Sequence, residues 1–108
     1  MINEPVKIQT DADFFRDITN RMADTFERKN STYGNSFAKS VNKYGMIAAL
    51  TRISDKFNRI ENLILGGSNN VPDESIKDTL LDLACYSVMT LMEVEKNQTQ
   101  SATNGTNS

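Results

Sequence analysis

The sequence predicts an all-α protein whose three main helices form an antiparallel bundle that oligomerisation completes. Two observations lead to this fold class. Apolar residues recur at steps of three and four in three separate segments, and residues typical of turns divide those segments. With 108 residues, of which 38% are hydrophobic and 24% charged, the chain has the composition of one folded domain.

The first helix is predicted to begin at Asp11 or Asp13, either of which can cap it, and to end near Arg28. Its apolar face is a run at intervals of four: Phe14, Ile18, Met22 and Phe26. Residues 1–12 form a polar lead before the helical domain, which we place at residues 13–96. Residues 29–39 are rich in Asn, Ser and Gly, so we expect a loop there.

The second helix is predicted from Asn42 or Tyr44 to Leu65, where a Gly-Gly pair ends it. Its apolar residues share one face at steps of three and four: Met46, Leu50, Ile53, Phe57, Ile60 and Ile64.

The third helix is predicted from Asp73 to about Lys96. Apolar residues extend past half of its circumference, so it needs neighbours on more than one side. Two other helices of the same chain hardly cover such a surface, which favours a homodimer or higher oligomer over a compact monomer. The uncharged polar residues 97–108 are expected to form a disordered tail.

Composition excludes several classes of function. The chain has no histidine, which removes Ser-His and Cys-His nucleophiles and the usual zinc sites. A net charge of -2 argues against binding long nucleic acids, although a basic patch can still hold a small anion. No apolar run is long enough to span a membrane, and no signal peptide is recognisable. Together with the single Cys85, these features predict a cytoplasmic protein.

A polar stripe on the second helix is the first candidate site. Arg52, Asp55, Arg59 and Asn62 follow at steps of three and four, and Lys56 borders them. Two guanidinium groups beside a carboxylate can grip a phosphate. The alternative is a solvated face on which Asp55 and Arg59 form an ordinary intrahelical pair.

An acidic ladder on the third helix is the second candidate. Glu74, Asp78 and Asp82 lie four residues apart, and apolar neighbours crowd Asp82. A carboxylate in such surroundings requires a partner. That partner is either one base of the second helix, namely Arg52, Lys56 or Arg59, or a Mg²⁺ ion shared by Asp78 and Asp82 with a phosphorylated ligand.

The segment from Lys29 to Phe37 is a third and weaker candidate. It offers an ammonium group, hydroxyl groups, amides and the ring of Tyr33, which can stack a base and contact a sugar or phosphate. Many ordinary connections between helices have a similar composition.

Three blocks occur in a fixed order along the chain. They are Lys29-x-x-x-Tyr33-Gly34-x-Ser36-Phe37, the segment 44–60 from Tyr44-Gly45 to Arg59-Ile60, and the acidic segment 73–86. Together they resemble the nucleotide modification associated domain, type 1, of phages and bacteria, over about residues 14–95. That family is distantly similar to the MazG-like all-α nucleoside triphosphate pyrophosphohydrolases. The resemblance implies a helical oligomer with a nucleotide-sized pocket.

The resemblance also implies roles for individual residues. Two would approach the base or sugar, Lys29 and Tyr33. Three would meet phosphates, Arg52, Lys56 and Arg59. Three would hold Mg²⁺ or orient water, Asp55, Asp78 and Asp82.

The carboxylates depart from the MazG-like pattern. Those enzymes carry Glu-x-x-Glu on one helix and Glu-x-x-Asp on the next, whereas this chain has Asp55-x-x-Asn58 and Asp78-x-x-x-Asp82. Three functions therefore stay open. They are a Mg²⁺-dependent (deoxy)nucleoside triphosphate pyrophosphohydrolase, a non-catalytic phage sponge that sequesters a host immune signalling nucleotide, and a protein-interaction scaffold. In the enzyme, Asp55, Asp78 and Asp82 would be catalytic, with Mg²⁺ on the last two.

Overall fold

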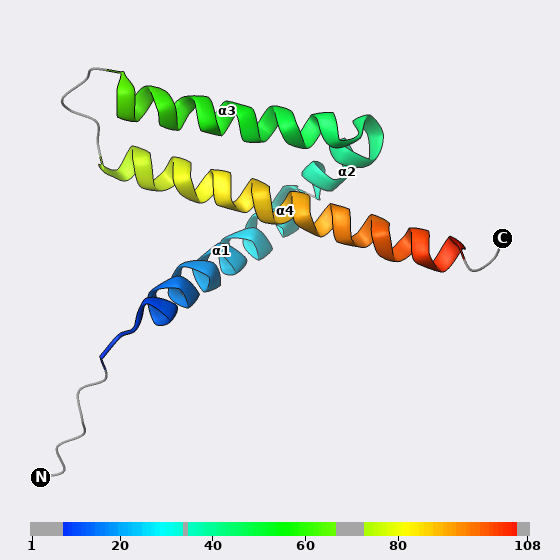
Figure 1. Cartoon of the computed structure of the whole chain (residues 1–108), viewed down its shortest axis with the longest axis horizontal. Helices are drawn as coiled ribbons and strands as arrows, with labels where there is room; N and C mark the ends of the chain where they lie inside the picture. The colour runs from blue at the N-terminus through cyan, green and yellow to red at the C-terminus, as the bar shows by residue number, and fades with distance from the viewer. Residues whose placement is uncertain (1–7, 34, 67–72, 106–108) are drawn as a thin grey trace, which may run out of the picture.

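The computed structural model describes residues 8–33, 35–66 and 73–105, and within these ranges it has four helices and no strand. They are α1 (Asp11–Tyr33), α2 (Ser36–Tyr44), α3 (Met46–Leu65) and α4 (Asp73–Gly105) (Figure 1). The predicted all-α class is confirmed. The arrangement differs from the predicted three-helix bundle, because a fourth, short helix is present and α1 diverges from the others.

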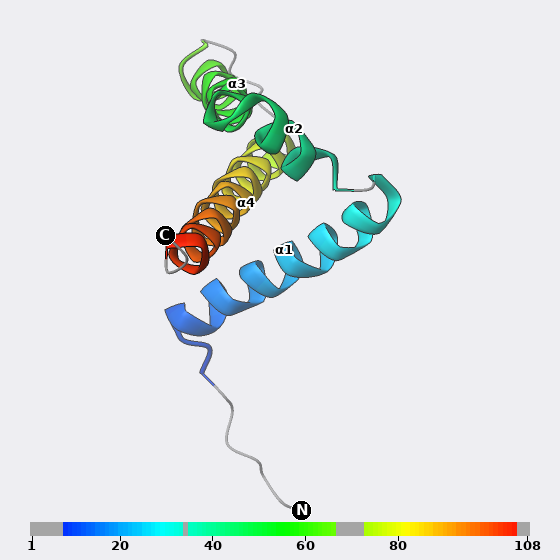
Figure 2. The same cartoon turned by 90° about the vertical axis from the view of Figure 1, so that its right-hand side faces the viewer.

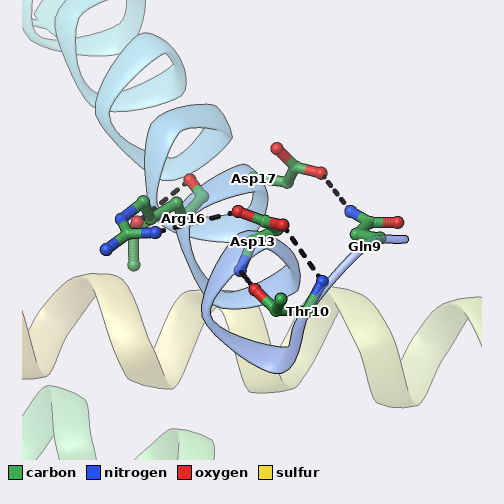
Figure 3. A network of polar contacts seen from close by, with 6 residues as sticks. Gln9, Thr10, Asp13, Arg16 and Asp17 are labelled. Atoms are coloured by element: carbon green, nitrogen blue, oxygen red, sulfur yellow. Dashed lines mark hydrogen bonds and ion pairs between the residues drawn. The ribbon is translucent and has the colours of Figure 1, made fainter. Parts of the chain in front are cut away.

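The start of α1 is fixed by a reciprocal capping arrangement (Figure 3). The Asp13 amide donates to Thr10 Oγ1 at 3.1 Å, and the Thr10 amide donates to Asp13 Oδ2 at 3.0 Å. Gln9 Nε2 also donates to Asp17 Oδ2 at 2.7 Å. The two contacts between Thr10 and Asp13 satisfy backbone amides that the first turn leaves without helical partners. The capping residue is therefore Thr10, and Asp13 acts from the third helical position.

The predicted loop over residues 29–39 is wrong. Helix α1 continues to Tyr33, and α2 begins at Ser36. Asn35 lies between them in the left-handed region, with φ 63° and ψ 38°, a conformation that Asn tolerates better than most residues. Ala38 and Val41 of α2 are 7% and 4% exposed, so tertiary packing stabilises this nine-residue helix.

Gly45 separates α2 from α3. Its φ of 80° and ψ of -168° lie in a region that is open almost only to glycine. The Gly45 amide donates to the Val41 carbonyl at 2.7 Å, and the Gly45 carbonyl accepts from the Ala48 amide at 3.1 Å. One glycine thus ends α2 and allows α3 to leave in a new direction.

Helices α3 and α4 lie side by side and antiparallel, and they form the most extensive contact between elements (Figure 1). Only part of the apolar face that was predicted for α3 is turned inward. Ala49 is 1% exposed, and Ile53 and Ile60 are half-buried. The remaining predicted residues of that face are exposed: Met46, Leu50, Phe57 and Ile64.

Helix α1 stands apart from this pair. Its middle part passes α4, while its N-terminal end runs away from α4 in Figure 1 and its C-terminal end runs away in Figure 2. Contact between α1 and α4 is correspondingly slight. On the apolar face of α1, Met22 and Phe26 are half-buried, whereas Phe14 and Ile18 are exposed.

Helix α4 continues to Gly105, so its predicted end near Lys96 is wrong. A disordered tail was predicted for residues 97–108, whereas the helical backbone continues to Gly105. Residues 106–108 of that tail lie outside the described ranges. Residues 1–7 of the predicted lead also lie outside them. Of the helices described, none combines the length and the apolar character that crossing a bilayer requires.

Candidate functional site

A cleft of about 850 Å³ lies between α1 and α4, and the start of α2 closes one end. Its volume falls within the range of about 300–1,000 Å³ that is typical of small-molecule sites. Helix α1 contributes Arg21, Met22, Asp24, Thr25, Phe26, Lys29 and Asn30; α2 contributes Ser36 and Phe37; α4 contributes Asp78, Leu81, Asp82, Cys85, Tyr86 and Met89.

The end of the cleft beside α2 is aromatic. The rings of Phe37 and Tyr86 lie with their centroids 5.6 Å apart and their planes tilted by 48°. Phe37 reaches this place because α2 starts directly after the turn at Asn35. Two rings in a cleft wall offer a surface on which a flat heterocycle can stack.

The wall formed by α4 changes from acidic to aromatic along its length. Asp78, Asp82 and Tyr86 follow at intervals of four, so they share one side of the helix and span roughly 12 Å. Two carboxylates therefore precede an aromatic ring along this wall of the cleft. The predicted acidic ladder thus includes two residues of the cleft.

Asp82 has a partner on α3. Lys56 Nζ lies 3.0 Å from Asp82 Oδ2, and the two side chains are 29% and 44% exposed. The sequence predicted that Asp82 needs a cation and left open which one. The structure places Lys56 there, and Asp82 contributes both to this ion pair and to the cleft wall.

The cationic groups of the cleft come from α1. Arg21 and Lys29 line it, whereas Arg52, Lys56 and Arg59, the predicted phosphate ligands, do not belong to its lining. Arg21 and Lys29 belong to a run at intervals of four with Thr25 between them, which puts all three on one side of α1. Lys29 was expected at the site, near the base or sugar, whereas Arg21 was missed, although its spacing to Lys29 is visible in the sequence beside the apolar run.

Arg59 bonds to the packed face of α4 instead. Its Nε donates to Thr79 Oγ1 at 3.2 Å, and Thr79 Oγ1 donates to the Ser75 carbonyl at 2.6 Å. Thr79 is 2% exposed, so its hydroxyl is a buried polar group whose hydrogen bonds are made. Arg59 thereby ties α3 to α4.

The other two predicted residues of α3 do not line this cleft. Arg52 and Asp55 are exposed and are not among the cleft-lining residues. Asp55 consequently does not stand with Asp78 and Asp82 in the cleft. The side chain of Tyr33, predicted to meet a base or sugar, lies outside the described part of the structure.

Cys85 lies in the same wall, between the carboxylates and the aromatic end. Burial raises the pKa of its thiol, the charge of Asp82 raises this pKa further, and the charge of Lys29 opposes both effects. Lys29 of α1 and Asp82 of α4 therefore both act electrostatically on the middle of the cleft. Bases and acids thus converge there, although the bases come from α1 and not from α3.

The donor set fits Mg²⁺ only with help from a ligand. Within residues 8–33, 35–66 and 73–105, no three acidic or cysteine side chains are grouped closely enough to hold a metal ion. Mg²⁺ nevertheless often binds through one or two carboxylates, with substrate phosphates and water as its other ligands. Asp78 and Asp82 meet that lesser requirement, provided that a phosphorylated molecule occupies the cleft.

Comparison with protein families gives a match. The model of the family described as nucleotide modification associated domain 1 matches residues 29–94, more than half of the chain. The match includes α2, α3, Lys29 and every cleft residue of α4, whereas Arg21 precedes it. Neither the curated proteins nor the solved structures contain a significant match.

Proposed function

This chain belongs to the nucleotide modification associated domain 1 family, and from that premise we propose that it binds a nucleotide in the cleft between α1 and α4. The observation that carries the proposal is the order of chemistry along α4. The carboxylates of Asp78 and Asp82 precede the Tyr86 ring along α4, and the helix rises about 12 Å from Asp78 to Tyr86. A nucleotide has a corresponding order, with a flat base at one end and phosphates at the other.

The base would stack at Phe37 and Tyr86, and the phosphates would extend toward Asp78 and Asp82. Arg21 and Lys29 would donate charged hydrogen bonds to phosphate oxygens.

The lining holds three carboxylates against two cationic side chains, so an anionic nucleotide needs additional positive charge. Mg²⁺ held by Asp78 and Asp82 would supply it, by neutralising phosphate charge and polarising a phosphoryl oxygen.

Two activities follow from such a complex. In the first, the protein is a Mg²⁺-dependent pyrophosphohydrolase of MazG-like type, in which water attacks a (deoxy)nucleoside triphosphate and releases the nucleoside monophosphate and pyrophosphate. Asp78 would orient the attacking water or hold the ion, and Lys29 would meet the phosphate charge that develops.

The second activity is retention of the nucleotide without reaction. The observation that favours it is the ion pair between Lys56 and Asp82, because that carboxylate already has a cation 3.0 Å away. A nucleotide sponge encoded by a phage and acting in the host cytoplasm is the biological form we propose for this activity.

A thermal-shift screen with product analysis tests the proposal. The full chain is heated with deoxynucleoside triphosphates, ribonucleoside triphosphates and cyclic nucleotides, each with and without Mg²⁺. A ligand at 100 times its Kd should stabilise the folded state by about 2.7 kcal/mol. Chromatography of the stabilising nucleotide after incubation then separates the two activities, since a pyrophosphohydrolase releases pyrophosphate and a sponge returns the ligand unchanged.

Two variants make the screen specific to the cleft. Tyr86→Ala removes the stacking surface and should abolish the shift, whereas Tyr86→Phe keeps the ring and should retain it. If no nucleotide raises the melting temperature of the wild-type protein, nucleotide binding is wrong, and a protein-interaction scaffold becomes the leading account.

A further inference from the structure

Helices α3 and α4 each carry a stripe of exposed apolar side chains. Along α3, apolar residues alternate at steps of four and three from Met46 to Ile64, which is the spacing of a coiled-coil seam. Part of that seam packs on α4, and the rest is open. The open side chains of both helices are between 47% and 62% exposed, and we call them the outer face: Leu50, Phe57 and Ile64 of α3, and Leu80 and Leu91 of α4.

The two stripes lie on the same side of the helix pair. Lys56 bonds to α4 and Thr79 bonds to α3, so these residues mark the sides on which the helices face each other. Phe57 follows Lys56 by about 100° clockwise, viewed from the N-terminus of α3, and on α4 Leu80 follows Thr79 by the same angle. Because the helices are antiparallel, the same sense of rotation leads to the same side of the pair (Figure 1).

The outer face lies behind the wall of the cleft. Leu80 and Leu91 are roughly 160° and 180° around α4 from Asp82, which lines the cleft. A partner on the outer face therefore leaves the cleft open.

Contacts within the chain fix the register of the pair. Lys56 is level with Asp82, and Arg59 is level with Thr79, so each step forward along α3 is a step back along α4. A two-fold axis parallel to the helices would lay α3 of one copy on α4 of the other, antiparallel and at the levels that they have within one chain.

In that arrangement the two outer faces interdigitate. Phe57 meets Leu80 of the partner subunit, and Leu50 lies between Ala84 and Leu91 of the partner subunit. The small side chain of Ala84 lets the facing helices approach closely. The result is a four-helix bundle in which neighbouring helices are antiparallel.

The charges beside the outer face favour a second copy as its occupant. Glu61 of α3 and Lys77 of α4 are both exposed, and within one chain they lie at opposite edges of the helix pair. The same register makes Glu61 level with the partner's Lys77, at the same edge of the bundle. Each acid would thus meet a base of the other copy, and the two-fold axis repeats this pair on the opposite edge.

We propose that two copies of this chain associate through the outer face, with α3 of each copy packed on α4 of the other. The four helices form the centre of the dimer, and the two clefts open on its opposite sides. Such an interface is self-complementary, so it closes on two subunits. The association rests on the outer face and its flanking charges and does not depend on nucleotide binding.

Light scattering after size-exclusion chromatography tests the proposal on the full chain without nucleotide. At micromolar concentrations the wild-type mass should be twice the 12.1 kDa of one chain. Phe57→Glu places a charge in the outer face and should give the mass of one chain. Phe15→Glu makes the same change on α1, where Phe15 is 69% exposed, and should leave the dimer intact. A monomeric wild-type protein, or an oligomer that Phe57→Glu leaves intact, overturns the proposal.

Charge reversal tests the packing of α3 on the partner's α4, at exposed positions where the fold tolerates change. Glu61→Lys and Lys77→Glu each bring like charges together and should raise the dimer Kd roughly five-fold by sedimentation equilibrium. Combining the two changes restores opposite charges across the interface and should return the Kd close to the wild-type value. If the combined variant associates no more tightly than the single variants, this arrangement of the helices is wrong.

Discussion

Lys56 Nζ of α3 lies 3.0 Å from Asp82 Oδ2 of α4, and this ion pair connects the packed face of the helix pair with the wall of the cleft. Both side chains are partly exposed, so the pair should stabilise the fold only modestly. Its more important effect is to keep the Asp82 carboxylate in place at the edge of the cleft.

The first prediction concerns the coupling between these two residues. Lys56→Met and Asp82→Asn should each lower the free energy of unfolding, and the double variant should lose less than the sum of the two. Urea denaturation of the four proteins in this cycle measures the coupling, which should reach up to about 1 kcal/mol. Strict additivity would mean that the ion pair does not form in solution.

The second prediction separates a structural role for Arg59 from the phosphate-binding role that the sequence suggested. Thr79→Val removes the buried hydroxyl that accepts from Arg59 and should destabilise the protein by about 1–2 kcal/mol. Thr79→Ser keeps the hydroxyl and should retain the hydrogen bond. Neither variant should alter nucleotide affinity, because neither Thr79 nor Arg59 lines the cleft. A large loss of affinity in Arg59→Ala would restore the original assignment.

The third prediction uses Cys85 as a probe of the cleft. Burial and the charge of Asp82 raise the pKa of its thiol, so alkylation by iodoacetamide should be slow at neutral pH and should accelerate only at a pH above that needed for a free thiol. Asp82→Asn should lower this pKa and Lys29→Met should raise it. A bound nucleotide should protect Cys85 from alkylation. Equal alkylation rates with and without a nucleotide that raises the melting temperature would place that ligand elsewhere.

The fourth prediction tests which carboxylates serve Mg²⁺. Asp78→Asn should remove the dependence of nucleotide binding on Mg²⁺, because Asp78 faces the cleft. Asp55→Asn makes the same chemical change on the exposed side of α3 and should have no effect. Titration of the nucleotide at several Mg²⁺ concentrations measures both. If Asp55→Asn alone removes the dependence, the metal site includes the surface of α3.

Sequence periodicity predicted the helices well where apolar spacing was regular. The third predicted helix does start at Asp73, the second does end at Leu65, and the run from Phe14 to Phe26 does lie within α1. The short α2 was missed because Asn, Ser and Gly dominate its surroundings. Burial of Ala38 and Val41 outweighs those local preferences, and local preferences are all that a sequence pattern records.

The site was predicted in part for a similar reason. Asp78, Asp82 and Lys29 do line one cleft, and Asp82 does pair with Lys56, one of the three bases named for it, although the Asp82 side chain is 44% exposed. The three bases predicted to meet phosphates lie on α3 outside the lining, and the cationic side chains of the cleft come from α1. Which helix faces α4 at that point depends on the turn at Asn35 and on the crossing of α1 over α4, and neither is encoded in helical periodicity.

The central claim is that a nucleotide binds between α1 and α4, and isothermal titration of Lys29→Ala tests it most directly. Lys29 lines the cleft, whereas Lys77 is exposed on α4 outside the lining, so Lys77→Ala is the matched control. Loss of a charged hydrogen bond of about 1.5–3 kcal/mol should raise the Kd about ten- to a hundred-fold in Lys29→Ala and leave it unchanged in Lys77→Ala. Equal affinity in Lys29→Ala and the wild-type protein would contradict the claim.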